Sequence, residues 1–369
     1  MNTQLLLVFI FFTLSAVSCL KVILQLSAKT DLLRFSEKIL ISEYECIEIG
    51  NFKAIMGEFD TNFVKSLFFD ESVEAISIDR QVQIANLHHQ QSAPKHLVRL
   101  SQAGPIVKQQ HLDFIYNGTG KDTRVFILDT GILSNHSDFT GRVQTFDPKN
   151  TTHCDVNGHG TAVASLVGSE LFGVSKEVTL IDYPVLHDNG IGVISNVLSA
   201  LDKIVKAGVP GVILMPFIGK KSVLFENALR EVVTAGFPIV VPAGNFARDA
   251  CKYSPSGAEH VITVGSINSY TDTIAKFSNY GPCVDLFCDG VDIVSLAPFN
   301  EMITVNSGTS MSAALVTGVV ATLMGRSSMD ILASLKSMAI RGGIRPMDFL
   351  VQSATDNLIA SNIKFNETE

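Results

Sequence analysis

Apolar and polar positions follow two different patterns along the chain, and these patterns divide it into two parts. Between residues 20 and 85, short apolar runs typical of strands alternate with segments whose apolar residues have helical spacing. The predicted strands are Val22–Leu26, Ile47–Ile49, Phe52–Phe59 and Val73–Ile78, and the predicted helices are Asp31–Ile39 and Asn62–Phe69. The order β-α-β-β-α-β is typical of the ferredoxin-like arrangement. The polar stretch Ala85–Pro94 has no periodicity and predicts a linker.

From Thr123 onwards, short apolar runs alternate with longer helical patterns. The predicted strands are Arg124–Leu128, Val178–Leu186, Val212–Pro216, Phe237–Pro242 and Val261–Val264, and the predicted helices are Gly160–Val167, Ile194–Lys206, Val223–Ala235 and Ala313–Met324. This alternation indicates an α/β fold with a mostly parallel sheet covered by helices on both faces. In such a sheet, reactive side chains gather at the carboxyl ends of the strands.

The first 18 residues carry a separate apolar pattern. The run Leu5–Leu14 is followed by the small residues Ala16 and Ser18. A run of this length is typical of a secretory signal peptide, whereas a membrane-spanning helix needs about 20 residues. We therefore expect residues 1–18 to be a signal peptide of a secreted or cell-surface protein. An N-terminal membrane anchor is the alternative.

Composition and charge exclude several classes of protein. Hydrophobic residues make up 46% of the 369 residues and charged residues 17%, which excludes a disordered chain. The net charge of −8 and the absence of a basic cluster disfavour a nucleic-acid binder and a protein held on anionic membranes. Four glycosylation sequons begin at Asn117, Asn135, Asn150 and Asn366 and are consistent with a secreted glycoprotein.

Three polar residues stand at the ends of predicted elements. Asp129 ends a strand, His159 lies between glycines at a helix start, and Ser310 precedes an apolar helix. A serine hydroxyl becomes a nucleophile when an imidazole takes its proton, and a carboxylate orients that imidazole. The amide of Asn245 and the backbone N–H of Ser310 could stabilise an oxyanion. Taken singly, the three residues could equally be a capping carboxylate, a core histidine and a helix N-cap.

These motifs together resemble the subtilisin-like serine proteases, and most of all their proteinase K-like subgroup. The order Asp129, His159, Asn245, Ser310 is the family order, and the resemblance extends from about residue 94 to about residue 360. It implies a three-layer subtilisin-like fold for residues 89–369. Residues 19–88 resemble the inhibitor-like propeptide of the same proteases, with the boundary expected within residues 84–91. A permanent second domain is the alternative for this part.

The resemblance also implies where substrate would bind, as an added strand between two chain segments. The residues implied are Gly190, Gly192, Pro216, Ile218, Gly219, Ala243 and Gly244. An ordinary surface turn is the alternative for residues 189–192. Pro216 and Ile218 replace a serine and a glycine of the family pattern, so one backbone donor is lost and a branched side chain points toward the expected pocket. The expected pocket is therefore narrower than in the family or rearranged, which brings substrate preference and activity into question. A one-residue shift of the alignment, which would bring Gly219 into this place, is the alternative. Ala162 and Ala314 are smaller departures from the family pattern.

The resemblance implies one disulfide and one metal site. Cys251 and Cys283 match positions that pair in some members of the subgroup, whereas Cys154 and Cys288 could be free or could pair with each other or with another chain. A structural calcium ion could bind the Asp285 carboxylate and the carbonyls of Glu259 and Val261, because Ca²⁺ prefers oxygen ligands. A surface aspartate beside a turn is the alternative. No organic cofactor is implied.

The sequence thus predicts a secreted serine endopeptidase that acts on polypeptides, as a monomer, after it has removed its own inhibitory propeptide. Its activity should fall as the pH drops through the pKa of His159. The alternative is a secreted, non-catalytic protein of the same fold that acts in binding or structure, because Pro216 and Ile218 alter the substrate wall. A lipase or esterase is disfavoured because residues 308–312 lack the second glycine of the G-x-S-x-G motif.

Overall fold

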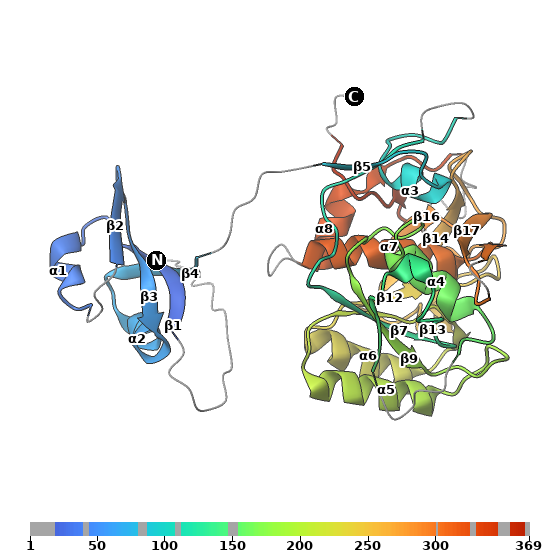
Figure 1. Ribbon diagram of the computed structural model, residues 1–369, viewed down its shortest axis with the longest axis horizontal. Helices are drawn as coiled ribbons and strands as arrows, with labels where there is room; N and C mark the ends of the chain where they lie inside the picture. The colour runs from blue at the N-terminus through green and yellow to red at the C-terminus, as the bar shows by residue number, and fades with distance from the viewer. Residues whose placement is uncertain are drawn as a thin grey trace. The chain divides into compact units, whose positions relative to one another are not determined.

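The computed structural model describes residues 19–39, 44–79, 87–107, 112–146, 154–299, 302–324, 330–345 and 355–365. The predicted signal peptide lies outside these residues. The chain divides into two compact units, residues 1–85 and residues 86–369, and each is considered by itself (Figure 1).

The first unit is a four-stranded antiparallel sheet with helices on one face. Its elements are β1 (Cys19–Leu26), α1 (Leu32–Ser36), β2 (Tyr44–Ile49), β3 (Phe52–Asp60), α2 (Thr61–Ser66), the 3₁₀ turn η1 (Leu67–Phe69) and β4 (Val73–Ile78). The strand order is β2-β3-β1-β4. Leu24, Ile55 and Phe59 form a core with Phe35 of α1 and Val64 of α2. The predicted β-α-β-β-α-β order is therefore the order observed.

The second unit contains the other described helices. They are α3 (Lys95–Leu100), α4 (His159–Gly168), α5 (Ile194–Ala207), α6 (Val223–Thr234), α7 (Thr309–Met324) and α8 (Ile331–Met338), with 3₁₀ turns η2 (Ser137–Phe139) and η4 (Ala250–Lys252). Its strands are β5 (His88–Gln90), β6 (Phe114–Tyr116), β7 (Arg124–Asp129), β8 (Val143–Thr145), β9 (Thr179–Pro184), β10 (Val212–Leu214), β11 (Gly219–Lys220), β12 (Ile239–Pro242), β13 (Tyr253–Ser254), β14 (Ile262–Asn268), β15 (Thr273–Ile274), β16 (Leu286–Asp289), β17 (Ile293–Leu296), β18 (Ile303–Asn306), β19 (Ile340–Arg341) and β20 (Leu358–Ile359).

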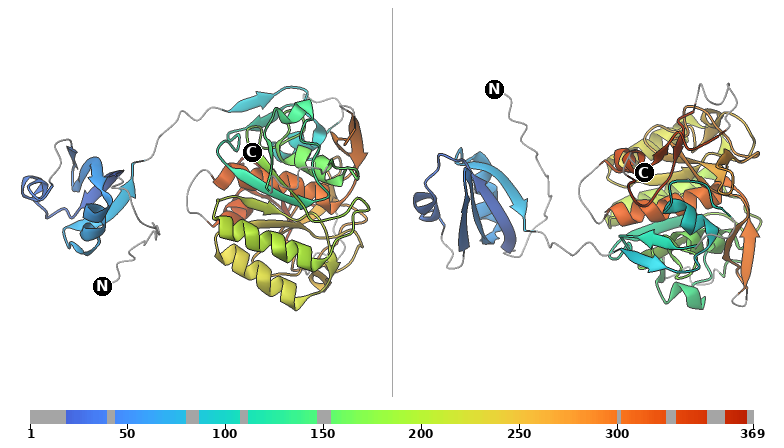
Figure 2. Two further views of the ribbon diagram at one scale, coloured as in Figure 1. Left: turned by 60° about the horizontal axis from the view of Figure 1, so that its bottom comes forward. Right: turned by 90° about the horizontal axis from the view of Figure 1, so that it is seen from above.

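Most of these strands form one central sheet. Its order within the described residues is β19-β20-β16-β14-β12-β10-β7-β9-β8. From β8 to β20 all neighbouring pairs are parallel. Successive residues of a strand face opposite sides, and both sides are covered. Ile127 packs in the cluster that contains α4 and α7, whereas Leu128 packs in the cluster that contains α5 and α6. Figure 2 shows these helix layers on the two faces, and the predicted three-layer α/β fold is confirmed.

Two local predictions were wrong. Residues 88–90 lie within the predicted linker but form β5, which pairs with β6, and His88 stacks on Tyr116 with ring centroids 5.0 Å apart. The polar sequence of this segment hid a strand because only one short partner covers it. The strand predicted to end at Pro216 ends at Leu214. The backbone N–H of Met215 makes the last hydrogen bond to the neighbouring strand, to the carbonyl of Val240. Pro216 has no N–H with which to continue.

Candidate active site

Asp129 and His159 come together where β7 ends and α4 begins. The Nδ1 atom of His159 lies 2.8 Å from Oδ2 and 3.0 Å from Oδ1 of Asp129. The Asp129 carboxylate is buried and also accepts a hydrogen bond from the amide of Thr130. Burial disfavours the imidazolium, but the charge and hydrogen bond of Asp129 and the charge of Asp155 outweigh it, so the pKa of His159 is raised above its ordinary value.

Asp155 holds this pair in position, and the sequence analysis did not identify it. Its carboxylate is fully buried and accepts hydrogen bonds from the hydroxyl of Thr130, the amides of Gly158 and Thr161, and the hydroxyl of Thr161, at 2.6–2.9 Å. Asp155 therefore ties the segment after Asp129 to both sides of His159. The one signal in the sequence was a carboxylate four residues before the histidine.

Ser310 is the second residue of α7, and its side chain is half-buried. Its hydroxyl donates to the carbonyl of Pro216 at 2.9 Å. Among the contacts of the described residues it makes no hydrogen bond to His159. Catalytic hydrogen bonds of this kind often form only when substrate is bound. The N–H of Ser310 lies in the first turn of α7, where amides have no partner within the helix.

Asn245 presents its amide nitrogen beside the start of α7. Its Oδ1 accepts from the backbone N–H of Thr309 at 2.9 Å and from the Thr309 hydroxyl at 2.8 Å. That hydroxyl in turn accepts from the amide of Gly244, so it must donate to Asn245. The hydrogen bonds therefore orient the Asn245 side chain, and its NH₂ group remains available for a substrate oxygen.

The segment that precedes Asn245 is held rigidly. The buried Asn279 donates through its side chain to the Ala243 carbonyl and through its backbone to the Gly244 carbonyl, both at 2.8 Å. Its Oδ1 also accepts from the amides of Phe246 and Arg248. Asn279 is therefore a second supporting residue that the sequence analysis missed, because it lies more than 30 positions away along the chain.

The expected substrate-binding residues lie in three groups. Phe217 and Ile218 connect β10 with β11 and make no backbone hydrogen bond to the described residues, whereas Gly219 pairs with Ser254. Gly190 has a positive φ of 74° and its amide donates to His187, and Gly192 bridges to Leu186. Residues 189–192 thus close a turn. Ala243 and Gly244 lie in the rigid segment described above.

The residues expected to hold calcium do not fit a metal ion at Asp285. The Lys336 ammonium lies 3.0 Å from Oδ1 of Asp285 and 3.6 Å from Oδ2 of Asp356, and Oδ2 of Asp285 accepts from the amide of Thr263. Burial lowers the pKa of Lys336, but the two carboxylates outweigh it, so the pKa is raised and the ammonium is charged. A cation of the chain itself therefore occupies the carboxylate that calcium would need.

The other two expected ligands are the backbone carbonyls of Glu259 and Val261, and both residues lie directly before β14. Within the described residues, no three side chains of His, Cys, Asp or Glu form a cluster that could bind a metal.

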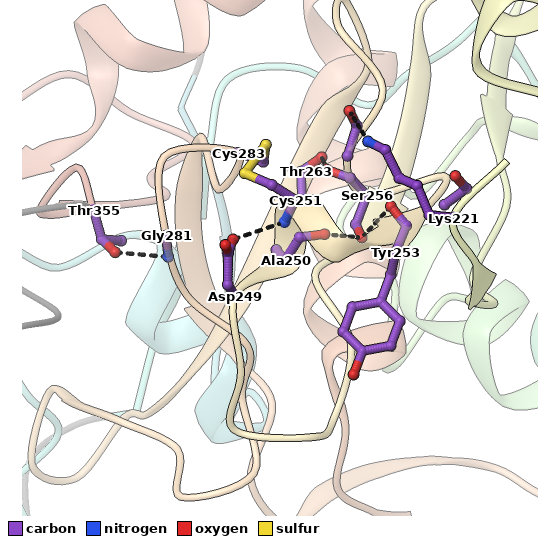
Figure 3. Close-up of a disulfide and its surroundings, with 12 residues drawn as sticks. Lys221, Asp249, Ala250, Cys251, Tyr253, Ser256, Thr263, Gly281, Cys283 and Thr355 are labelled. Carbon is purple, nitrogen blue, oxygen red and sulfur yellow. Dashed lines mark hydrogen bonds between the residues drawn. A yellow bond between two sulfur atoms is a disulfide. The ribbon is translucent and has the colours of Figure 1, made fainter. Parts of the chain in front are cut away.

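Cys251 and Cys283 form the disulfide that the resemblance implied, with Cα atoms 5.3 Å apart (Figure 3). Asp249 accepts from the amide of Cys251, and Gly281 donates to the hydroxyl of Thr355. The bridge closes a loop of 32 residues, which would add about 4 kcal/mol in the chain-entropy model. Of the cysteines left open, Cys154 is exposed and Cys288 is buried, and both are free.

Two of the predicted sequons can be located. The side chains of Asn117 and Asn135 are exposed, whereas Asn150 and Asn366 lie outside the described residues. None of the described helices has both the length and the hydropathy required to cross a bilayer.

Comparisons with known proteins agree with this architecture. The model of the Subtilase family matches residues 120–342. The Subtilase-type proteinase RRT12 of Saccharomyces cerevisiae is 37% identical over 295 residues, which is 74% of this chain and 60% of that protein. The Subtilisin-like protease 1 of Pseudogymnoascus destructans is 33% identical over 324 residues, 85% of this chain and 78% of that protein.

One further relative is named for its extracellular location, and one solved structure shares the fold. The Extracellular serine proteinase of a Thermus species is 42% identical over 215 residues, 56% of this chain and 52% of that protein. A crystal structure of a cold adapted subtilisin-like serine proteinase superposes with a TM-score of 0.66 and 29% identity, covering 74% of this chain and 99% of that one. The chain spans about 60% of the length of the first two curated relatives it matches. By its sequence and its fold, the chain belongs to the Subtilase family.

Proposed function

We propose that this protein is a secreted serine endopeptidase of the proteinase K-like subgroup that hydrolyses polypeptides. The observation that carries the proposal is the hydrogen-bonded Asp129–His159 pair at the edge of the sheet. The neighbouring parallel strands β7, β10 and β12 end at this edge. Asp129 is the last residue of β7, Pro216 follows β10, and Asn245 follows β12. Ser310 contacts Pro216, and Thr309 contacts Asn245. These contacts support the assignment of one reaction centre to these segments.

The proposed reaction assigns one role to each group. The Ser310 oxygen bonds to the carbonyl carbon of the substrate, and its proton passes to Nε2 of His159. Asp129 holds Nδ1–H and stabilises the imidazolium, while Asn245 and the Ser310 N–H donate to the oxyanion. His159 then protonates the departing amine as the C–N bond breaks, and water releases the acyl group by the same steps. His159 must be neutral to begin, so activity falls as the pH drops through its raised pKa.

We further propose that residues 19 to about 88 are a propeptide that first inhibits the peptidase and is then removed by it. The separate compact unit that ends at Ala85 supports this assignment. The extracellular relative supports passage through the secretory pathway, for which residues 1–18 would be the signal. A monomer is the expected product.

The test is to express the wild type and Ser310→Ala in a secretory host and to sequence the N-termini of the products. Only the wild type should lose its N-terminal unit, with the new N-terminus within residues 84–91, because cleavage requires the Ser310 hydroxyl. A matched control is Ser307→Ala. Ser307 is exposed, its hydroxyl donates to Asp292, and it has no role in the proposed reaction. This variant should be processed like the wild type.

Other outcomes separate the alternatives. If both proteins are cut alike, a host protease removes the unit, and reaction of the trimmed wild type with a fluorophosphonate probe decides whether Ser310 is active. If neither is cut and the probe labels neither, the proposal is wrong. The rival assignment would then hold, namely a non-catalytic binding protein in which Pro216 and Ile218 alter the substrate wall. The observation that favours this rival is the hydrogen bond that Ser310 donates to the carbonyl of Pro216, because the hydroxyl is directed to Pro216 and not to His159.

A further inference from the structure

The geometry around Ser310 locates the side chain of the residue that precedes the cleaved bond. The substrate carbonyl carbon must approach the Ser310 oxygen, and its oxygen must approach the Asn245 amide. The Cα atom of the preceding residue is bonded to that carbon at about 1.5 Å. Its side chain must therefore lie next to the residues that adjoin Asn245 and Ser310. These residues are Gly244 and the segment that begins with Pro216.

Ile218 and Gly244 already contact each other across this space. A Cβ atom built on Gly244 would lie only 2.5 Å from Cδ1 of Ile218 and 2.5 Å from Nδ2 of Asn279. Gly244 also has a positive φ of 105°, a conformation that glycine adopts without strain and that residues with a Cβ atom rarely adopt. The Ile218 side chain therefore extends to the backbone of Gly244 and takes up the space beside it.

Neither side of this contact can move away easily. Gly244 is fixed by hydrogen bonds to Thr309 and Asn279. Ile218 lies two residues after Pro216, whose φ is locked by its ring, and precedes Gly219, which pairs with Ser254. Isoleucine is branched at Cβ, so few rotamers are open to it. A large substrate side chain would have to displace the Ile218 side chain, whose Cδ1 lies against Gly244.

We propose that Ile218 restricts the residue before the cleaved bond to small side chains, namely glycine, alanine and serine. This inference rests on the proposed function and adds its substrate class. The unpaired backbone of Phe217 and Ile218 still lets an extended peptide run alongside them. The restriction thus acts on the side chain of the substrate and leaves its main chain free to bind.

The test uses a series of fluorogenic peptides that differ only in the residue before the cut, which is glycine, alanine, leucine or phenylalanine. The secreted wild type, Ile218→Ala and Ile218→Gly are compared, and Ile303→Ala serves as the control because Ile303 is an exposed isoleucine on β18. For the wild type we expect kcat/KM for alanine to exceed that for phenylalanine by on the order of 100-fold. Ile218→Gly should raise the phenylalanine value by a similar factor, and Ile303→Ala should change neither.

The outcomes distinguish this inference from the proposed function. A fluorophosphonate probe reports whether Ser310 is reactive, whatever the peptide preference. If the probe labels the wild type and the wild type cleaves phenylalanine as well as alanine peptides, the restriction by Ile218 is refuted and the peptidase assignment stands. The restriction is also refuted if Ile218→Gly leaves the ratio unchanged. If no peptide is cleaved and no label is found in any variant, the proposed function itself fails.

Discussion

Asp182 is a buried carboxyl that lies close to the Asp129–His159 pair. It stands on β9 opposite Ile127 of β7, and its side chain is 3% exposed. Its Oδ1 atom has no hydrogen-bond partner within the part of the chain that the structure describes. Burial, together with the charges of Asp155 and Asp129, raises the pKa of Asp182 to about 7 against the opposing hydrogen bond from Ile132. Asp182 can therefore change its charge near neutral pH.

The raised pKa predicts how stability depends on pH. Between about pH 4 and pH 7 the unfolded chain has an ionised Asp182 while the folded chain keeps it protonated, so stability falls as the pH rises. The loss amounts to about 4 kcal/mol at pH 8. In Asp182→Asn this loss is absent. Urea unfolding in the Ser310→Ala background, which prevents self-digestion, should show the variant gaining stability over its parent from pH 4 to pH 8.

A suitable control for this measurement is Asp202→Asn, because Asp202 is exposed on α5 and pairs with Lys206. It should follow the parent at every pH. Parallel pH profiles for Asp182→Asn and its parent would show that Asp182 ionises in the folded protein as it does in the unfolded one.

At the scale of elements, the disulfide joins two loops at the edge of the sheet. Cys251 lies in η4 just before β13, and Cys283 lies shortly before β16. The same loops carry Asp249 and Asn279, and the latter holds the segment of Asn245. The bridge therefore stabilises the loops behind the proposed oxyanion donor without touching the reacting atoms.

Removal of the bridge should therefore cost stability. The double variant Cys251→Ser/Cys283→Ser should lose about 4 kcal/mol of unfolding free energy, because the unfolded chain regains the freedom of the closed loop. Chemical denaturation in the Ser310→Ala background measures this loss, and Cys154→Ser, which removes an exposed free thiol, is the control. A double variant as stable as the control would contradict the prediction.

At the scale of the whole molecule, one ion-pair cluster joins segments that are far apart in the chain. Asp285 lies just before β16, Lys336 in α8, and Asp356 just before β20. Because Lys336 occupies the carboxylate, Asp285 should bind no calcium. If calcium did bind, a free calcium concentration of 100 times the dissociation constant would add about 2.7 kcal/mol to the free energy of unfolding. This gain corresponds to a rise of several degrees in Tm.

We therefore expect the Tm of the Ser310→Ala protein to be the same in EDTA as in millimolar calcium. Lys336→Met should lower the Tm because it leaves the half-buried Asp285 beside Asp356 without its cation. The control is Lys206→Met, which breaks an exposed pair on α5. A rise of several degrees with calcium in the unchanged chain would show that a metal binds despite Lys336.

The alternation of apolar runs was sufficient to predict both units, because strands buried on both faces and amphipathic helices leave strong local patterns. Asp129, His159, Asn245 and Ser310 could be selected because each stands at the end of an element beside glycine or a turn. Their catalytic roles stay predictions. The strand β5 escaped detection because three polar residues carry no pattern.

What the sequence by itself determined is therefore the order of the elements and the chemistry placed at their ends. Only the tertiary structure decided which side chains meet. Asp155 under the Asp129–His159 pair, Lys336 at Asp285 and Ile218 against Gly244 are contacts between different segments of the chain. Such contacts depend on how whole elements pack, and the pattern around each residue does not contain that information. The packing of one side chain thus decides which substrates we expect the site to accept.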